Sequence, residues 1–115
     1  MKPVSEMTPQ EIAEASARAM WNDDSASQRL GMSLDYIAPG QATLSMTITD
    51  TMSNGHGNAH GGYIFTLADS AFAFACNSHN QLAVAQHCSI TYLIPGRIGD
   101  RLTATAIETS RRGRS

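Results

Sequence analysis

The residues with the clearest potential for chemistry are one acid and two glycines near the middle of the chain. Asp69 lies within a run of small and apolar residues, where an isolated carboxylate must find a partner, take up a proton or be kept for chemistry. Gly61 and Gly62 precede that run. Since glycine has no Cβ, a ligand could approach the first free amides of a helix that starts there, and such amides hold anions or a developing oxyanion. The alternatives are an acid bonded to a nearby hydroxyl and a turn that needs glycine.

Four neighbouring polar residues have more than one interpretation. Asn54 starts an Asn-Gly pair that would suit a turn in any protein. His56 and His60 have the i, i+4 spacing of a zinc pair. The glycine and asparagine between them disfavour a helix and no third ligand follows nearby, so no metal site is predicted. His60 is instead expected to support the loop or a substrate carbonyl. Thr66 lies one turn before Asp69, and its hydroxyl could bond that carboxylate, the reacting group or its own backbone.

The order of these residues closely resembles that of a known family. The pattern is Asn54, then His60-Gly61-Gly62, then Asp69 on the following helix, which ends in Ala75-Cys76-Asn77-Ser78. It is similar to the hotdog-fold acyl-CoA thioesterases and, within them, to the PaaI-type branch of phenylacetate degradation. The likeness covers roughly residues 30–107. It implies a hotdog-fold thioester hydrolase.

The resemblance also implies a role for each residue. Asp69 would act as general base or as nucleophile in thioester hydrolysis. The amide at or next to Gly61 would polarise the thioester carbonyl, and Asn54 would orient the attacking water or the loop. The candidates for substrate contact are Gly62, Thr66 and Phe65, although the aromatic residues of this helix are expected in the core by default.

Length and composition bound the kind of protein. With 115 residues, 42% of them hydrophobic and 16% charged, the chain has the composition of a single globular domain over 1–115. No apolar run is long enough to span a membrane and no signal region opens the chain, so a cytoplasmic protein without a membrane partner is expected. Cys76 and Cys88 lack CxxC spacing and are expected to be reduced core thiols.

The charges are distributed unevenly. Residues 1–80 carry three Lys or Arg against eight Asp or Glu, whereas residues 81–115 carry five Arg against two acids. A positive end segment could hold the phosphates of coenzyme A, and Arg111 and Arg112 are the candidates. A solvated charge run is the alternative. Nucleic acid is not expected as a partner, because no aromatic residues are interleaved with these arginines.

Local patterns predict helices and strands in a definite order. A capping box at Thr8-Pro9-Gln10-Glu11 starts an accessory surface helix over about residues 9–21. Its narrow apolar face is expected to contain Ile12, Ala15, Ala19 and Met20. Strands are expected near residues 32–37, 42–48, 82–94 and 102–107, with a tight turn at Pro39-Gly40 and a long helix over residues 62–76. Apolar residues lie all round that long helix, which predicts burial on most sides.

This order has no βαβ rhythm, so the fold class is α+β with an antiparallel sheet against one central helix. It matches the hotdog arrangement that the resemblance implies, in which a curled sheet wraps a long helix. Family members normally carry two further strands after a turn like Arg111-Arg112-Gly113-Arg114. These C-terminal strands are expected to be missing from this chain, which would leave the strand at residues 102–107 with an unpaired edge.

The predicted function is hydrolysis of an aryl-acyl-CoA, such as phenylacetyl- or hydroxyphenylacetyl-CoA, or of a short acyl-CoA. No metal or redox cofactor is expected. A hotdog enoyl-CoA hydratase is disfavoured, because in such relatives a His follows the Asp by five residues and Phe74 stands there in this chain. A catalytically silent acyl-CoA binding module is the alternative from another class, and the presence of Asp69 argues against it.

The spacing of Asp69 and the glycines along one helix bears on how copies of the chain assemble. Asp69 is seven residues past Gly62, which places it about 10 Å further along a helix that rises about 1.5 Å per residue. One thioester carbon cannot contact both, so the amide donor must come from a second copy of the helix. A homodimer with shared active sites is therefore predicted, as the resemblance also implies, with possible pairing into a homotetramer.

Overall fold

Two long helices and a four-stranded sheet make up most of the described chain. The computed structural model describes residues 2–79, 84–92 and 97–112, with side chains described for residues 2–79 and 97–108. The elements in chain order are η1 (Val4–Glu6), α1 (Pro9–Asp23), α2 (Ser25–Arg29), β1 (Ser33–Ala38), β2 (Gln41–Thr47), η2 (Asp50–Met52), α3 (Gly61–Cys76), β3 (Val84–Tyr92) and β4 (Arg101–Arg112). The predicted order is confirmed, and the outer ends of the predicted strand at residues 82–94 lie outside the described residues.

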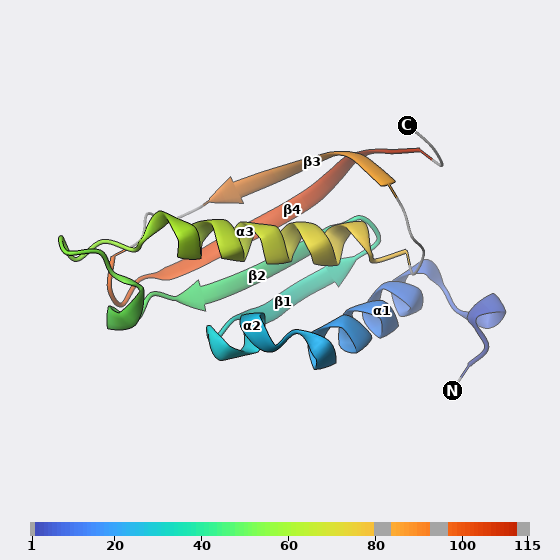
Figure 1. Cartoon of the computed structure of the whole chain (residues 1–115). Helices are drawn as coiled ribbons and strands as arrows, with labels where there is room; N and C mark the ends of the chain where they lie inside the picture. The colour runs from blue at the N-terminus through green and yellow to red at the C-terminus, as the bar shows by residue number, and fades with distance from the viewer. Residues whose placement is uncertain (1, 80–83, 93–96, 113–115) are drawn as a thin grey trace.

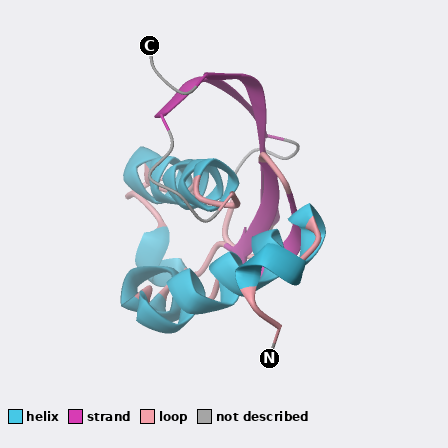
Figure 2. Cartoon of the chain, turned by 90° about the vertical axis from the view of Figure 1, so that its right-hand side faces the viewer, coloured by secondary structure: helices cyan, strands magenta, loops and turns pink. Residues whose placement is uncertain are grey.

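The sheet is antiparallel throughout, with the strand order β1-β2-β4-β3. α3 lies along one face of the sheet, and α1 lies beside α3 and next to β1 (Figures 1 and 2). This confirms the α+β arrangement of a long helix against an antiparallel sheet. The unpaired edge predicted for residues 102–107 is wrong, because β3 pairs with β4 on the side opposite β2. The edges of the described sheet are β1 and β3.

The core lies between α3 and the two central strands. Every second residue of β2 and β4 is buried beneath the helix, as expected for strands with one covered face; these residues are Ala42, Leu44, Met46, Leu102, Ala104 and Ala106. From α3, Leu67, Ala71 and Phe74 are buried against them. Burial of one Leu or Phe side chain contributes about 1.5–3 kcal/mol. These contacts therefore fix α3, and with it the residues predicted to do chemistry.

α1 begins at the predicted capping box. The Thr8 hydroxyl accepts a hydrogen bond from the Glu11 amide at 3.1 Å, and the Thr8 amide donates to the Glu11 carboxylate at 2.9 Å. The bond from the Thr8 amide, together with the nearby Lys2 ammonium, holds the pKa of Glu11 below its usual value. The N-terminus of α1 is thereby satisfied by its own first turn.

The buried face of α1 shares only Met20 with the predicted stripe. Ala13 and Ala17 are buried, and Met20 and Trp21 pack partly buried against the core. The sequence pointed instead to a stripe displaced around the helix, formed by Ile12, Ala15, Ala19 and Met20. The small alanines let α1 approach closely, and Trp21 reaches Phe74 of α3 with 6.3 Å between ring centroids. α1 therefore contributes to the core rather than serving only as an accessory.

The C-terminal end of α3 is tied to the turn between β1 and β2. The Ser78 hydroxyl accepts from the Gly40 amide at 2.7 Å and lies 2.8 Å from the Ala75 carbonyl, to which it donates. Beside this turn, Glu108 of β4 pairs with His79 at 3.2 Å. Gly40 has a φ of +73°, and an added Cβ would lie 3.2 Å from the Glu108 side chain. This junction therefore requires glycine at position 40.

Replacing Gly40 with Ala is expected to destabilise the fold by about 2–4 kcal/mol. A left-handed backbone costs about 1–2 kcal/mol for a residue with a Cβ, and crowding against Glu108 adds about 1–2 kcal/mol. Gly31→Ala is the matched control, because Gly31 has a φ of +74° but open space around an added Cβ. Urea unfolding of the two variants separates backbone strain from crowding. Equal losses of unfolding free energy in the two variants would show that the Glu108 side chain moves aside without an energetic cost.

Candidate active site

One face of α3 is left uncovered by the rest of the described chain. Gly62, Phe65, Asp69 and Phe72 follow one another at helical spacing, and Phe65 is 71% and Phe72 38% exposed. The predicted burial of this helix on most sides is wrong for this face, as is the core position expected by default for Phe65. Sequence could not reveal this, because apolar residues that meet a ligand or another chain have the same hydropathy as core residues. An exposed apolar stripe indicates such a contact.

Asp69 is exposed on this face of a single chain. Among the described residues no side chain bonds its carboxylate, because the two hydroxyls beside it are engaged elsewhere. The Thr66 hydroxyl donates to the Gly62 carbonyl at 2.8 Å, and the Ser70 and Ser27 hydroxyls bond each other at 2.8 Å. A neighbouring hydroxyl therefore does not occupy the Asp69 carboxylate, which is exposed in the described chain.

The loop before α3 is closed by Asn54. Its side-chain oxygen accepts from the amides of His56 at 2.9 Å and Asn58 at 3.3 Å. Its main-chain amide donates to the Asn58 carbonyl at 2.7 Å, and Gly57 turns the chain with a φ of +82°. The Asn54 oxygen thus holds the loop. The Asn54 side-chain nitrogen has no partner among the described residues, so it is the part that could donate to a water or a substrate.

The start of α3 leaves its amides accessible. The His60 amide donates to the Met52 carbonyl at 2.7 Å, and His60 is the N-cap without any side-chain cap bond. Gly61 and Gly62 are exposed, neither has a left-handed φ, and an added Cβ at either position would meet nothing within 4 Å. Neither backbone strain nor packing within one chain therefore requires glycine there. The absence of a Cβ leaves the helix amides open to an anion.

The structure brings some of the predicted site residues together and separates others. The Asn54 loop, His60 and the two glycines lie at the N-terminal end of α3. Asp69 lies about 10 Å further along the same helix. Arg111 and Arg112 end β4, at the opposite end of the sheet from the start of α3 (Figure 1); their side chains lie outside the described residues. The start of α3 and Asp69 are therefore two separate groups of predicted site residues within one chain.

Arg97 is a residue whose position sequence reasoning missed. An isolated bridge pairs Arg97 with Asn58, so this exposed arginine lies beside the loop that Asn54 closes. The sequence placed it only in a positive end segment, because nothing local links it to a loop so far away in the chain. Through this bridge, the backbone of Arg97 pairs with the loop that precedes the N-terminus of α3.

The described residues offer neither a metal site nor a membrane-spanning helix. In the part of the chain that the structure describes, no three His, Cys, Asp or Glu side chains are grouped to hold a metal ion. His56 and His60 are both exposed. None of the described helices combines the length and the apolar character needed to cross a bilayer.

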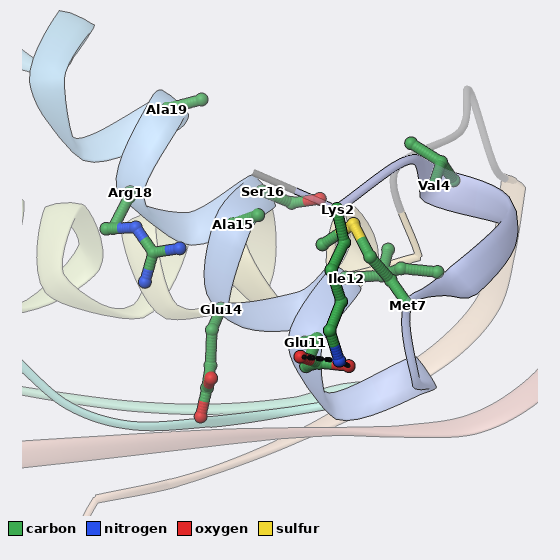
Figure 3. A pocket seen from close by; sticks show the side chains of 10 residues that line it. All are labelled: Lys2, Val4, Met7, Glu11, Ile12, Glu14, Ala15, Ser16, Arg18 and Ala19. Atoms are coloured by element: carbon green, nitrogen blue, oxygen red, sulfur yellow. Dashed lines mark hydrogen bonds and ion pairs between the residues drawn. The ribbon is translucent and has the colours of Figure 1, made fainter.

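A hollow of about 420 Å³ lies between α1 and the N-terminal segment (Figure 3). Lys2 and Glu11 form an ion pair of 3.0 Å in it, and the buried Ser16 hydroxyl has no partner among the described residues. No residue of α3 lines this hollow. It is therefore separate from the residues predicted to do chemistry.

Comparison with known proteins identifies relatives. A family model described as the thioesterase superfamily matches residues 56–115. The chain is 49% identical over 90 residues to acyl-coenzyme A thioesterase PaaI of Escherichia coli (strain K12), covering 78% of this chain and 64% of that protein. It is 32% identical over 77 residues to acyl-coenzyme A thioesterase 13 of Homo sapiens, covering 65% of this chain and 55% of that protein. The chain thus spans less than two thirds of the length of these relatives.

The fold has solved counterparts. The structure of the E. coli PaaI protein from the phenylacetic acid degradation operon matches with a TM-score of 0.77 and 45% identity, over 87% of this chain and 72% of that chain. The hotdog fold and the resemblance to the PaaI-type branch are confirmed by these matches. The matched region of the family model contains the two glycines and Asp69. The chain therefore belongs to the thioesterase superfamily.

Proposed function

We propose that this chain is an acyl-CoA thioesterase that hydrolyses an aryl-acyl-CoA, such as phenylacetyl- or hydroxyphenylacetyl-CoA, or a short acyl-CoA. The observation that carries the proposal is the exposed Asp69 carboxylate, which no described side chain bonds, between Phe65 and Phe72 on the open face of α3. The names of similar proteins support the substrate class, since one is an acyl-coenzyme A thioesterase and its structure belongs to a phenylacetic acid degradation operon. The cytoplasmic location expected from the sequence remains a prediction.

Asp69 can act in two ways, and both remain open. As a base it takes a proton from water while the water oxygen bonds to the thioester carbon. As a nucleophile its own oxygen forms that bond, and water then cleaves the resulting anhydride. In either route the carbon–sulfur bond breaks, and the coenzyme A thiolate leaves and takes up a proton. Amides at the start of α3 stabilise the negative charge on the carbonyl oxygen. Because neither route requires a metal or redox cofactor, none is proposed.

The proposed site is shared between two copies of the chain. Asp69 and the amides of its own helix are too far apart to act on one carbonyl. The open space around Gly61 and Gly62 means that any demand for glycine there comes from outside the single chain. The exposed Phe65 and Phe72 supply apolar area for contact with a second copy. We therefore propose a homodimer with shared active sites, assembling into a homotetramer.

A free-thiol release assay tests the proposed function. The chain is given phenylacetyl-CoA, hydroxyphenylacetyl-CoA, acetyl-CoA and crotonyl-CoA, each with and without a chelator. Thiol release that the chelator does not change is the expected result. Acyl-CoA binding without thiol release would favour the silent binding module, and loss of the crotonyl double bond without thiol release would favour the hydratase. Activity that the chelator removes and added metal restores would revive His56 and His60 as ligands.

Replacing Arg111 and Arg112 with Ala is expected to raise KM for coenzyme A esters by about twofold to thirtyfold. An ion pair at a protein surface typically contributes about 0.2–1 kcal/mol, and the loss of two such contacts to phosphate would also weaken the salt dependence of KM. Esters of a small thiol without the nucleotide provide the comparison, since their KM should stay unchanged. Arg29→Ala removes an exposed charge on α2 as the matched control. Equal effects on both kinds of ester would contradict the phosphate contact.

A further inference from the structure

A second hollow, of about 520 Å³, lies between α1 and β1. It shares Glu14 and Arg18 with the hollow beside the N-terminal segment, but Trp21, Met32, Leu34 and Ile37 line this second hollow and not the first. We call the second hollow the α1–β1 groove, and the residues that line it are Glu14, Ala17, Arg18, Trp21, Asn22, Met32, Ser33, Leu34 and Ile37. Its floor is apolar, since Ala17 is 3% and Met32 5% exposed. Trp21, Leu34 and Ile37 are partly buried and form its walls. It is an open groove with an apolar floor and an exposed polar rim, formed by Glu14, Arg18 and Asn22.

The acidic and basic residues of the groove lie at different positions along α1. Glu14 lies toward the start of α1 and accepts a hydrogen bond from the Gln10 side chain at 3.2 Å. Arg18 lies one turn further on, with Asn22 one turn beyond it, and both are exposed. No carboxylate lies within 4.0 Å of the Arg18 guanidinium among the described residues. The Trp21 end of the groove therefore offers a cation that the described chain does not neutralise.

The groove runs along an edge strand, where an extended peptide could in principle add to the sheet. Two features oppose this. The Gln10 side-chain amide donates to the Ile37 carbonyl at 2.8 Å and so occupies part of the strand edge. The register of β1 also shifts between Leu34 and Tyr36, and such a bulge blunts an edge against further pairing. The groove thus favours a compact ligand over a strand.

We propose that the α1–β1 groove binds a small apolar carboxylic acid, with its aryl or branched aliphatic part between Trp21, Leu34 and Ile37 and its carboxylate on Arg18. Guanidinium and carboxylate form paired, charge-assisted hydrogen bonds. The apolar part of such a ligand replaces water on the Trp21 ring. This site is distinct from Asp69 and the amides of α3, none of which lines the groove. The proposal does not depend on thioester hydrolysis.

Trp21 allows a direct test, because it is the only tryptophan of the chain. The whole chain is titrated with phenylacetate and, separately, with the uncharged phenylacetamide, while Trp21 fluorescence is recorded. A saturable change with phenylacetate is expected, with a Kd on the order of 1 mM for a ligand of this size. Arg18→Gln should weaken phenylacetate binding by about threefold to tenfold and leave phenylacetamide binding unchanged. Arg29→Gln removes an exposed charge elsewhere and should leave both unchanged.

A further variant separates the groove from the α3 face. Leu34→Phe adds volume in the groove and should weaken both probes while leaving acyl-CoA hydrolysis unchanged, with folding checked by urea unfolding. If Arg18→Gln binds phenylacetate as well as Arg29→Gln does, the proposed carboxylate contact is wrong. If Leu34→Phe folds and binds both probes like the original chain, the groove is not the binding site. A linear, non-saturating fluorescence change would likewise overturn the proposal, whatever the outcome of the thiol release assay.

Discussion

Asp69→Asn is expected to lower kcat for thioester hydrolysis by two or more orders of magnitude and to leave substrate binding nearly intact. The amide has the shape of the carboxylate but cannot take a proton from water or attack the thioester carbon. General-base catalysis typically contributes about 10²–10⁴-fold. Because the Asp69 side chain is exposed and unbonded among the described residues, the substitution breaks no interaction that holds the described fold.

The measurement combines thiol release with urea unfolding. The unfolding free energy of Asp69→Asn should stay within about 0.5 kcal/mol of the original, as for other exposed positions. Asp23→Asn, at the exposed end of α1, is the matched control and should change neither activity nor stability. Near-normal turnover in a folded Asp69→Asn protein would remove Asp69 from the mechanism. A large loss of stability instead would assign it a structural role.

Sequence predicted the features that depend on local chemistry. The Thr8 capping box fixes the start of α1 through bonds within a single turn. The Pro39-Gly40 turn joins two strands that pair directly, and α3 begins within one residue of its predicted start. The spacing from the glycines to Asp69 is a property of the chain itself. These features can be predicted without knowing which residues pack against them across the core.

The errors share a different cause, which is that they depend on contacts distant in sequence. The buried stripe of α1 depends on the packing of Trp21 near Phe74. No local sequence pattern predicts that contact. The interior position of β4 depends on the return of β3 to its free side. The open face of α3 was read as core because Phe65 and Phe72 are as apolar as Phe74, which is 1% exposed. Hydropathy reports that a residue avoids water, but not whether its own chain covers it.

The open face of α3 is the basis for a second prediction with a large expected effect. Two copies of the chain are expected to contribute to each active site. A two-fold axis between antiparallel α3 helices would bring the start of each helix beside the middle of the other. Each site would then take its amide donor at Gly61 from one copy and its carboxylate at Asp69 from the other. Asp69→Ala and Gly61→Val should each abolish activity alone, since both sites of a uniform dimer carry one defect. A Cβ added at position 61 meets nothing within 4 Å in a single chain, so urea unfolding of Gly61→Val is expected to show a fold close to the original and to place the loss of activity outside that fold.

Mixing the two inactive variants under conditions of subunit exchange is therefore expected to restore activity. In a mixed dimer one site receives both defects and the other receives neither, so one site in two works. Random exchange at equal amounts makes about half of the dimers mixed, which predicts recovery to about a quarter of the original activity. Each variant mixed with itself is the control and should stay inactive. Differently tagged subunits verify exchange, and no recovery despite demonstrated mixed dimers would mean that each chain completes its own site. That outcome would require the amides and Asp69 of one helix to approach the same carbonyl, which their separation of about 10 Å along the axis prevents unless α3 unwinds.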